Sequence, residues 1–173
     1  MIATKKLSLS QVKNEDNDFI VNYLACGEHA KYLPLERAYT REEAHKWFNG
    51  RLTHWLQHNF GTFIVQLRQQ KVAIGYCGIE YVRDTQYIDI RYGIARQFWG
   101  NGYAYEAALA VLKYGFSKHG FEKLHGAAVL KNIASIKLLE KLGMTEDKEF
   151  DVYGDGIVHL SVSKEKYTEI TEG

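Results

Sequence analysis

Hydrophobic and polar residues recur with two different periods along the chain, and these periods separate predicted strands from predicted helices. Period-two alternation predicts strands over 6–12 and 85–95, and apolar segments predict further strands over 62–67, 72–82 and 124–130. Helical spacing predicts helices over 14–25, 41–58, 103–118 and 132–142. We expect a loop over 28–39 and two last strands within 148–164 that turn near Gly154.

Capping signals support two of these helices. Thr40 and Glu43 have the spacing of a capping box, and Asn132 is the N-cap type of residue at the start of the helix over 132–142. Gly143 is then a typical stop. The helix over 41–58 has one apolar face, made of Ala44, Phe48, Leu52 and Trp55.

The order of the predicted elements is β, αα, βββ, α, β, α, ββ. The strands over 62–67 and 72–82 predict a hairpin, whereas strand, helix and strand over 85–130 predict a parallel pair with a crossover. The fold class is therefore α+β (mixed α/β): a central mixed, largely antiparallel sheet of about seven strands flanked by about four helices. Pro34 is the only proline and no linker is visible, so we expect a single domain over 1–173.

Composition excludes several classes of protein. Hydrophobic residues make up 46% of the 173 residues, charged residues 25%, and the net charge is +1 with no basic stripe. We therefore expect no direct nucleic-acid partner. No apolar run reaches the roughly 18 residues of a membrane span. Residues 1–6 lack a signal-peptide core and there are two cysteines, so we expect a cytoplasmic protein without a membrane partner.

The segment over 88–107 has the features of an anion-binding turn. A strand ends at Ala95, a loop contains Gly100 and Gly102, and a helix begins near Tyr103. Free N–H groups at a helix N-terminus attract phosphate, and glycine lets the backbone approach it. Spacing alone equally fits a plain strand–helix turn. The Rossmann fingerprint is excluded because Tyr105 stands where the third glycine belongs, and the lysine of a P-loop is missing.

A second segment decides between these interpretations. The chain contains Trp99-Gly-Asn-Gly-Tyr-Ala-Tyr-Glu-Ala107 and, later, Asn132-Ile-Ala-Ser-Ile-Lys-Leu-Leu-Glu-Lys-Leu-Gly143. Together the two segments resemble motifs of the GNAT superfamily of N-acetyltransferases, in particular its branch of ribosomal-protein-alanine acetyltransferases. Both motifs occur in the family's order over 88–143, and the element order extends the likeness to nearly the whole chain.

The resemblance implies a binding site for acetyl-coenzyme A as co-substrate. The backbone of Ile94 would pair with the pantetheine arm, and the Asn132 side chain would make a further contact. The pyrophosphate would be held by the backbone N–H groups of Trp99, Gly100, Asn101, Gly102, Tyr103 and Ala104. Trp99 departs from the Arg or Gln of the broader superfamily. Arg96 stands where relatives often have proline, and we expect it to loosen the loop.

The resemblance also suggests catalytic residues. Asp89 would accept the proton of the amine, directly or through water, with Glu80 or water alone as alternatives. A solvent-facing carboxylate, or one paired with Arg91, is the competing interpretation of Asp89. Ser135 would protonate the leaving thiolate, because Leu139 stands where many members have tyrosine. Being a small hydrophobe in an apolar strand, Cys77 suggests no acyl-enzyme, and no metal site is expected.

We therefore expect an acetyl-CoA-dependent N-acetyltransferase that works by direct attack of a primary amine. The acceptor is left open between a protein N-terminus, such as the N-terminal alanine of a ribosomal protein, and a small-molecule amine. The alternative is a non-catalytic acyl-CoA-binding sensor, which needs the loop but neither Asp89 nor Ser135. The chain is expected to be a monomer or a homodimer.

Overall fold

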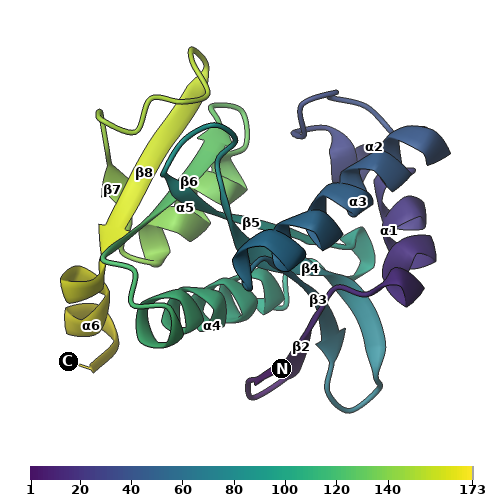
Figure 1. The fold of residues 1–173 in the computed structure, drawn as a ribbon, viewed down its shortest axis with the longest axis horizontal. Helices are drawn as coiled ribbons and strands as arrows, with labels where there is room; N and C mark the ends of the chain where they lie inside the picture. The colour runs from purple at the N-terminus through teal and green to yellow at the C-terminus, as the bar shows by residue number, and fades with distance from the viewer. Residues whose placement is uncertain (173) are drawn as a thin grey trace. The chain divides into compact units, whose positions relative to one another are not determined.

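The computed structural model describes residues 1–172 (Figure 1). Its strands are β1 (Ile2–Ala3), β2 (Leu7–Gln11), β3 (Thr62–Leu67), β4 (Val72–Tyr81), β5 (Ile88–Ile94), β6 (Lys123–Val129), β7 (Thr145–Glu146) and β8 (Ile157–Ser163). Its α-helices are α1 (Asn17–Leu24), α2 (Gly27–Ala30), α3 (Arg41–His58), α4 (Tyr103–Lys118), α5 (Ile133–Lys141) and α6 (Lys164–Glu172). Two 3₁₀ turns, η1 (Asn14–Asp16) and η2 (Arg96–Phe98), precede α1 and the loop before α4.

The described residues form a mixed sheet of eight strands in the order β1-β2-β3-β4-β5-β6-β8-β7. Strand β5 pairs in parallel with β6, whereas the pairs β1–β2, β2–β3, β3–β4, β6–β8 and β7–β8 are antiparallel, so the predicted mixed, largely antiparallel sheet is confirmed. The counts are higher than predicted because β1, α2 and α6 were not expected. The chain divides into two compact units. The first unit is Met1–Gly78 with Arg91–Ala107, and the second is Ile79–Ile90 with the chain from Ala108 onward.

In the first unit, α3 has the predicted bounds because local capping fixes its start. The Glu43 N–H donates to Thr40 Oγ1 at 3.2 Å, and the Thr40 N–H donates to the Glu43 carboxylate at 2.9 Å. Phe48 is 1% exposed, and the Trp55 indole N–H donates to the Thr62 carbonyl at 2.6 Å, which ties α3 to β3. Helices α1 and α3 lie side by side (Figure 1).

The strands of the first unit pair as the sequence predicts. Strands β3 and β4 form the expected antiparallel hairpin, with Ile64 opposite Tyr76, and β2 pairs antiparallel with β3. Ile64 is fully buried and Tyr76 is 3% exposed. The hairpin therefore has the buried apolar positions that its sequence indicates.

In the second unit, β6 pairs antiparallel with β8 along its whole length, and α5 packs on β6. Gly126 allows this close approach, because a Cβ there would lie 2.7 Å from the Leu139 side chain. Asp89 on β5 stands opposite His125 on β6 in the parallel register. The predicted crossover from strand to helix to parallel strand is thus confirmed.

Of the two strands predicted within 148–164, the second is present and the first is not. Strand β8 is present, but its partner β7 ends at Glu146 and residues 147–156 form a loop. The Asp147 side chain explains the difference, because its Oδ1 accepts the N–H groups of Glu149 at 3.1 Å and Phe150 at 3.4 Å. A side-chain turn of this kind replaces strand pairing.

Candidate active site

The glycine loop has the backbone conformation that the sequence indicates. Gly100 and Gly102 have φ angles of 78° and 76°, in the left-handed region that favours glycine. A Cβ built at either position would meet no other atom within 4 Å, so that side of the loop is open space. The loop joins Ile94, the buried last residue of β5, to Tyr103, the first residue of α4.

The first turn of α4 offers N–H groups and holds its own acidic residue in place. Its first intrahelical bond runs from the Glu106 N–H to the Gly102 carbonyl at 3.0 Å, so the N–H groups before Glu106 have no carbonyl within the helix. The Glu106 carboxylate accepts the Lys6 N–H at 2.7 Å and the Thr4 hydroxyl at 2.6 Å. Lys6 Nζ lies 5.7 Å from the ring centroid of Tyr103, which adds positive charge here.

Two side chains within the loop donate hydrogen bonds to its backbone and hold its conformation. The indole N–H of Trp99 donates to the Ile94 carbonyl at 2.6 Å. The Asn101 amide donates to the carbonyls of Phe98 at 3.0 Å and Trp99 at 3.1 Å. These bonds explain why Trp99 fits at a position where relatives carry Arg or Gln: its ring closes the loop onto the end of β5.

The expectation that Arg96 loosens the loop stays a prediction, but one contact of Arg96 argues against it. Its backbone N–H, which a proline lacks, donates to Nε2 of His29 at 2.9 Å. The His29 ring stacks on Tyr23 with centroids 4.2 Å apart, and its Nδ1 lies 2.9 Å from the Tyr23 carbonyl. Since that carbonyl only accepts, Nδ1 carries the proton and Nε2 is the acceptor. His29 therefore ties the loop to α2, a contact that no local sequence signal indicates.

Taken together, the loop residues fit a diphosphate. Two glycines in the left-handed region keep the backbone bare, the helix N-terminus presents N–H groups and the positive end of its dipole, and Lys6 contributes a nearby cation. The arrangement lies wholly within the first unit.

Asp89 lies in the second unit and is buried, with 3% exposure, so it is not a solvent-facing carboxylate. Its Oδ2 accepts a hydrogen bond from the hydroxyl of Tyr153, in the loop between β7 and β8. His125, opposite Asp89 in the register, has its Nδ1 3.1 Å from the Ile88 carbonyl. Burial lowers the pKa of His125, which leaves its imidazole neutral at pH 7. Sequence reasoning missed Tyr153, because it predicted a strand there.

Asn132 is the N-cap of α5, as predicted. Its Oδ1 accepts the backbone N–H of Ser135 at 3.2 Å, and both side chains are half-buried. Leu139, where many superfamily members have tyrosine, is 1% exposed and belongs to the core. Ser135 thus remains the hydroxyl that the resemblance points to on this helix.

Glu80 and Cys77 are both buried on β4. Glu80, the alternative base, is 1% exposed in the second unit. Cys77 is fully buried, and burial raises the pKa of its thiol, so the nucleophilic thiolate is disfavoured. The predicted role of Cys77 as a small buried hydrophobe is confirmed.

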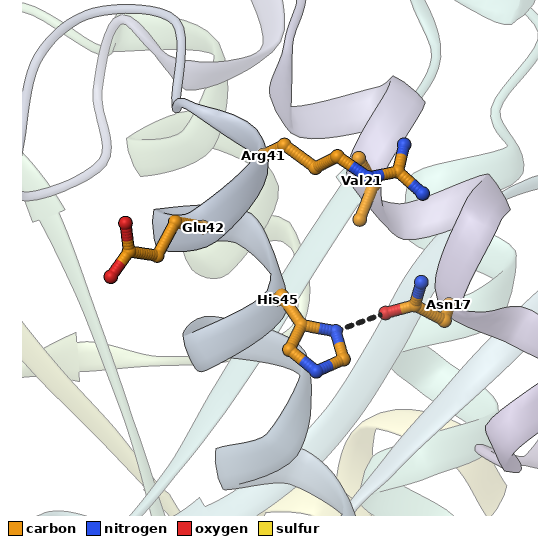
Figure 2. A pocket seen from close by; sticks show the side chains of 5 residues that line it. All are labelled: Asn17, Val21, Arg41, Glu42 and His45. Carbon is orange, nitrogen blue, oxygen red and sulfur yellow. Dashed lines mark hydrogen bonds between the residues drawn. The ribbon is translucent and has the colours of Figure 1, made fainter.

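A pocket of about 470 Å³ lies elsewhere in the first unit, between α1 and α3 (Figure 2). It is lined by Asn17, Val21, Arg41, Glu42 and His45, none of which is a predicted site residue. His45 Nδ1 and Asn17 Oδ1 lie 2.8 Å apart, and the Glu42 carboxylate points away from the other side chains (Figure 2). The pocket therefore does not locate the predicted chemistry.

Residues 1–172 contain no group of three or more His, Cys, Asp or Glu side chains arranged to hold a metal ion. Over the same residues, no helix combines the length and apolar character needed to cross a membrane.

Curated proteins similar to this chain include two from Bacillus subtilis. The uncharacterized protein YkkB of Bacillus subtilis is 33% identical over 110 residues, which cover 62% of this chain and 64% of YkkB, less than two thirds of that protein. The uncharacterized N-acetyltransferase YnaD of the same organism is 28% identical over 150 residues, covering 86% of this chain and 85% of YnaD.

Solved structures share the fold. An acetyltransferase from Agrobacterium tumefaciens superimposes with a TM-score of 0.85 at 19% identity, covering 94% of both chains. Spermidine N-acetyltransferase from Vibrio cholerae, in complex with CoA and spermine, has a TM-score of 0.76 at 22% identity and covers 95% of this chain and 99% of that one. Ribosomal-protein-S5-alanine acetyltransferase from Vibrio fischeri has a TM-score of 0.73 at 18% identity and covers 95% and 97%.

A family model described as the acetyltransferase (GNAT) domain matches residues 6–145, well over half of the chain and including both the glycine loop and the Asn132 cap. The sequence motifs, the mixed sheet with its parallel β5–β6 pair and the open loop before α4 agree with this match. The chain belongs to the GNAT acetyltransferase family.

Proposed function

We propose that this protein is an acetyl-CoA-dependent N-acetyltransferase that acetylates a primary amine by direct attack. The observation that carries the proposal is the loop before α4, where Gly100 and Gly102 leave an open backbone beside the N-terminus of a helix in a GNAT family member. The similarity to YnaD, an uncharacterized N-acetyltransferase by name, supports the same activity. Strands β4 and β5 and helix α4 each contribute residues to both units, which favours a single domain over 1–173.

Most contacts with bound acetyl-CoA come from backbone groups of this chain. The pyrophosphate is held by N–H groups over 100–104, and the pantetheine arm pairs with the backbone of Ile94. The predicted N–H of Trp99 is left out because it already donates to the Arg96 carbonyl at 3.1 Å. The Ile94 carbonyl already accepts the Trp99 indole N–H, but a carbonyl has two lone pairs and the backbone N–H is a second pairing group. The Asn132 side chain, whose Oδ1 caps α5, retains its amide N–H groups for a further contact.

Transfer of the acetyl group from the thioester to an amine requires one proton acceptor and one proton donor. The neutral amine attacks the thioester carbonyl carbon, the C–S bond breaks, and the amine loses one proton while the thiolate gains one. Asp89 accepts the first proton, directly or through water, and Ser135 gives the second to the thiolate while it takes a proton from solvent. Direct attack agrees with the burial of Cys77, because a covalent acetyl-enzyme would need a reactive nucleophile.

The acceptor is a protein N-terminus or a small-molecule amine. The fold neighbours named for ribosomal-protein-S5-alanine and for spermidine acetylation illustrate both kinds of acceptor. An α-amine, with a pKa near 8, asks less of a base than a lysine side chain near 10.4. A single buried aspartate is therefore better matched to an α-amine, which slightly favours the protein N-terminus.

The test is a thiol-release assay with acetyl-CoA and a panel of amines. The panel contains an Ala-initiated peptide, the same peptide with a blocked N-terminus and an internal lysine, a polyamine and free amino acids. Saturable, amine-dependent thiol release supports the proposal, and the peptide pair separates α-amine from lysine acceptors. Saturable CoA binding without turnover on any amine would instead indicate an acyl-CoA sensor. An absence of any calorimetric signal with millimolar CoA would reject both functions.

A further inference from the structure

The hydroxyl of Tyr153 reaches a buried carboxylate from the surface of the second unit. Asp89 is 3% exposed, whereas Tyr153 is 41% exposed, and the two residues are 64 positions apart in sequence. We infer that Tyr153 is a positioning residue for Asp89: its O–H fixes the carboxylate rotamer and stabilises the ionised form that accepts the amine proton. The inference rests on the proposed function, in which Asp89 is the base.

The loop that carries Tyr153 is fixed independently of Asp89. Phe150 is fully buried and acts as its anchor, and the Tyr87 hydroxyl donates to the Glu149 carbonyl at 3.0 Å. Asp147 accepts the N–H groups of both Glu149 and Phe150. The segment leading to Tyr153 is thereby held by its own contacts.

Strand β8 fixes the tyrosine itself. The Tyr153 ring lies nearly parallel to His159, at 15° with centroids 6.0 Å apart, and its backbone N–H lies 3.2 Å from His159 Nε2. Because an N–H donates, that ring nitrogen is the acceptor. The hydroxyl therefore reaches Asp89 from a preorganised ring, so little conformational entropy is lost when the bond forms.

The charges around Asp89 explain why a donor is needed there. His125, on the neighbouring β6, is neutral at pH 7 because burial lowers its pKa. The other titratable groups on the packed elements are Glu80 on β4, Arg91 on β5 itself, Lys123 on β6, Tyr87 before β5, and Asp147, Asp151 and His159 around the Tyr153 loop. Burial disfavours the charged carboxylate, and a hydroxyl that donates to it opposes this cost.

Removing the Tyr153 hydroxyl should make Asp89 a weaker base while the aromatic ring stays in place. In Tyr153→Phe the ring and its stacking on His159 remain, but the donor is lost. We expect kcat to fall about tenfold, the magnitude typical of a hydrogen bond to a charged group. The acid limb of kcat/KM should move to higher pH, because the ionised form of Asp89 loses a stabilising bond. CoA affinity should stay close to that of the parent, and the melting temperature should fall by only a few degrees, because one hydrogen bond to a buried carboxylate is lost.

The matched control is Tyr114→Phe on α4, which removes a hydroxyl that lies 2.8 Å from Nε2 of His119. Its kcat and pH profile should be unchanged. In the double variant Tyr153→Phe/Asp89→Asn, kcat should equal that of Asp89→Asn alone, since a positioning residue acts only through its partner. Placing 3-fluorotyrosine at position 153, a stronger hydrogen-bond donor, should move the acid limb to lower pH and gives a test that keeps the native fold.

The outcomes separate this inference from the function on which it rests. If Asp89→Asn slows turnover but Tyr153→Phe and the 3-fluorotyrosine protein both match the parent, the positioning role is wrong and the acetyltransferase stands. Additive losses in the double variant would also overturn it. If no amine is acetylated, or Asp89→Asn is fully active, the proposed role of Asp89 fails and the inference fails with it.

Discussion

The backbone N–H of Arg96 donates to Nε2 of His29 across 67 positions of sequence, at 2.9 Å. The family resemblance places a proline at this position, and a proline has no backbone N–H, so the bond exists only because this chain has arginine here. Ala95 has φ −59° and ψ 140°, a conformation that also suits a residue before proline. Substitutions at position 96 therefore allow a comparison of loops with and without the hydrogen bond to His29.

We expect Arg96→Pro to bind CoA about five- to tenfold more weakly than Arg96→Ala, because only the proline variant loses the hydrogen bond to His29. Calorimetry measures both affinities. The alanine variant reports the loss of the side chain alone, and the difference between the two isolates the N–H. Equal affinities would show that this hydrogen bond does not support the loop.

Gly102→Glu should abolish CoA binding, because it places a side chain and a negative charge beside the helix N-terminus that would hold the pyrophosphate. Gly120→Glu is the matched control. Gly120 has a φ of 68° and open space at its Cβ position, so it imposes similar backbone strain outside the loop. Calorimetry should give parent-like affinity for the control alone. Unchanged affinity in Gly102→Glu would remove the loop from the binding site.

Asp89→Asn should lower kcat about 100-fold near neutral pH, the lower range for losing a general base. The loss should shrink as pH rises, because a larger fraction of the amine is then already neutral. Asp84→Asn, an exposed position in the β4–β5 turn, should behave like the parent. A pH series of initial rates makes the comparison, and an Asp89→Asn enzyme with parental activity at pH 7 would direct attention to Glu80 or to water.

Ser135→Ala should reduce kcat about tenfold while leaving CoA affinity nearly intact, because a general acid acts on the leaving group. The substitution preserves the helix cap, since Asn132 accepts the backbone N–H of Ser135 and not its hydroxyl. Ser117→Ala on α4 is the control for loss of a helical serine. Steady-state rates and calorimetry separate the two effects, and an unchanged kcat would assign the proton to water.

Asp147 should make stability depend on pH below neutrality. Burial raises the pKa of Asp147, but hydrogen bonds from Ser161 and Lys123 outweigh it, and the net pKa is lowered. A lowered pKa in the folded state stabilises the protein above the unfolded value of about 3.9, and this contribution is lost as pH falls through the folded value. Asp147→Asn should therefore be about 1 kcal/mol less stable at pH 7, with the gap narrowing as pH falls below the unfolded pKa toward the lowered folded pKa.

Urea unfolding at pH 7 and at pH 3 measures this effect. Asp155→Asn, at an exposed carboxylate in the turn before β8, is the control and should show no pH-dependent difference from the parent. A constant gap between Asp147→Asn and the parent at pH 7 and pH 3 would show that the charge of Asp147 does not contribute.

Features set by neighbouring residues were predictable from the sequence. Thr40 and Glu43, three positions apart, defined the start of α3, and Asn132 defined the start of α5. The glycine loop was recognisable because positive φ angles at Gly100 and Gly102 require a particular residue type.

Features set by distant residues were not predictable. Tyr153 meets Asp89 across 64 positions, and no local pattern distinguishes it from the alternating residues of a strand. The same holds for His29, placed in a predicted loop. The strand predicted over the first part of 148–164 is absent, because the Asp147 side chain accepts backbone N–H groups that a strand would use for pairing. The periodicity of the sequence does not encode this competition.

The burial of Cys77 has a practical consequence for assays of this enzyme. Reagents that detect released coenzyme A by its free sulfhydryl also react with accessible cysteines. Of the two cysteines, only Cys26 is partly accessible in the native fold, so the enzyme should add at most one equivalent of background colour. A second equivalent that appears during a time course would then report unfolding, and each reaction would carry its own indicator of whether the catalyst is still intact.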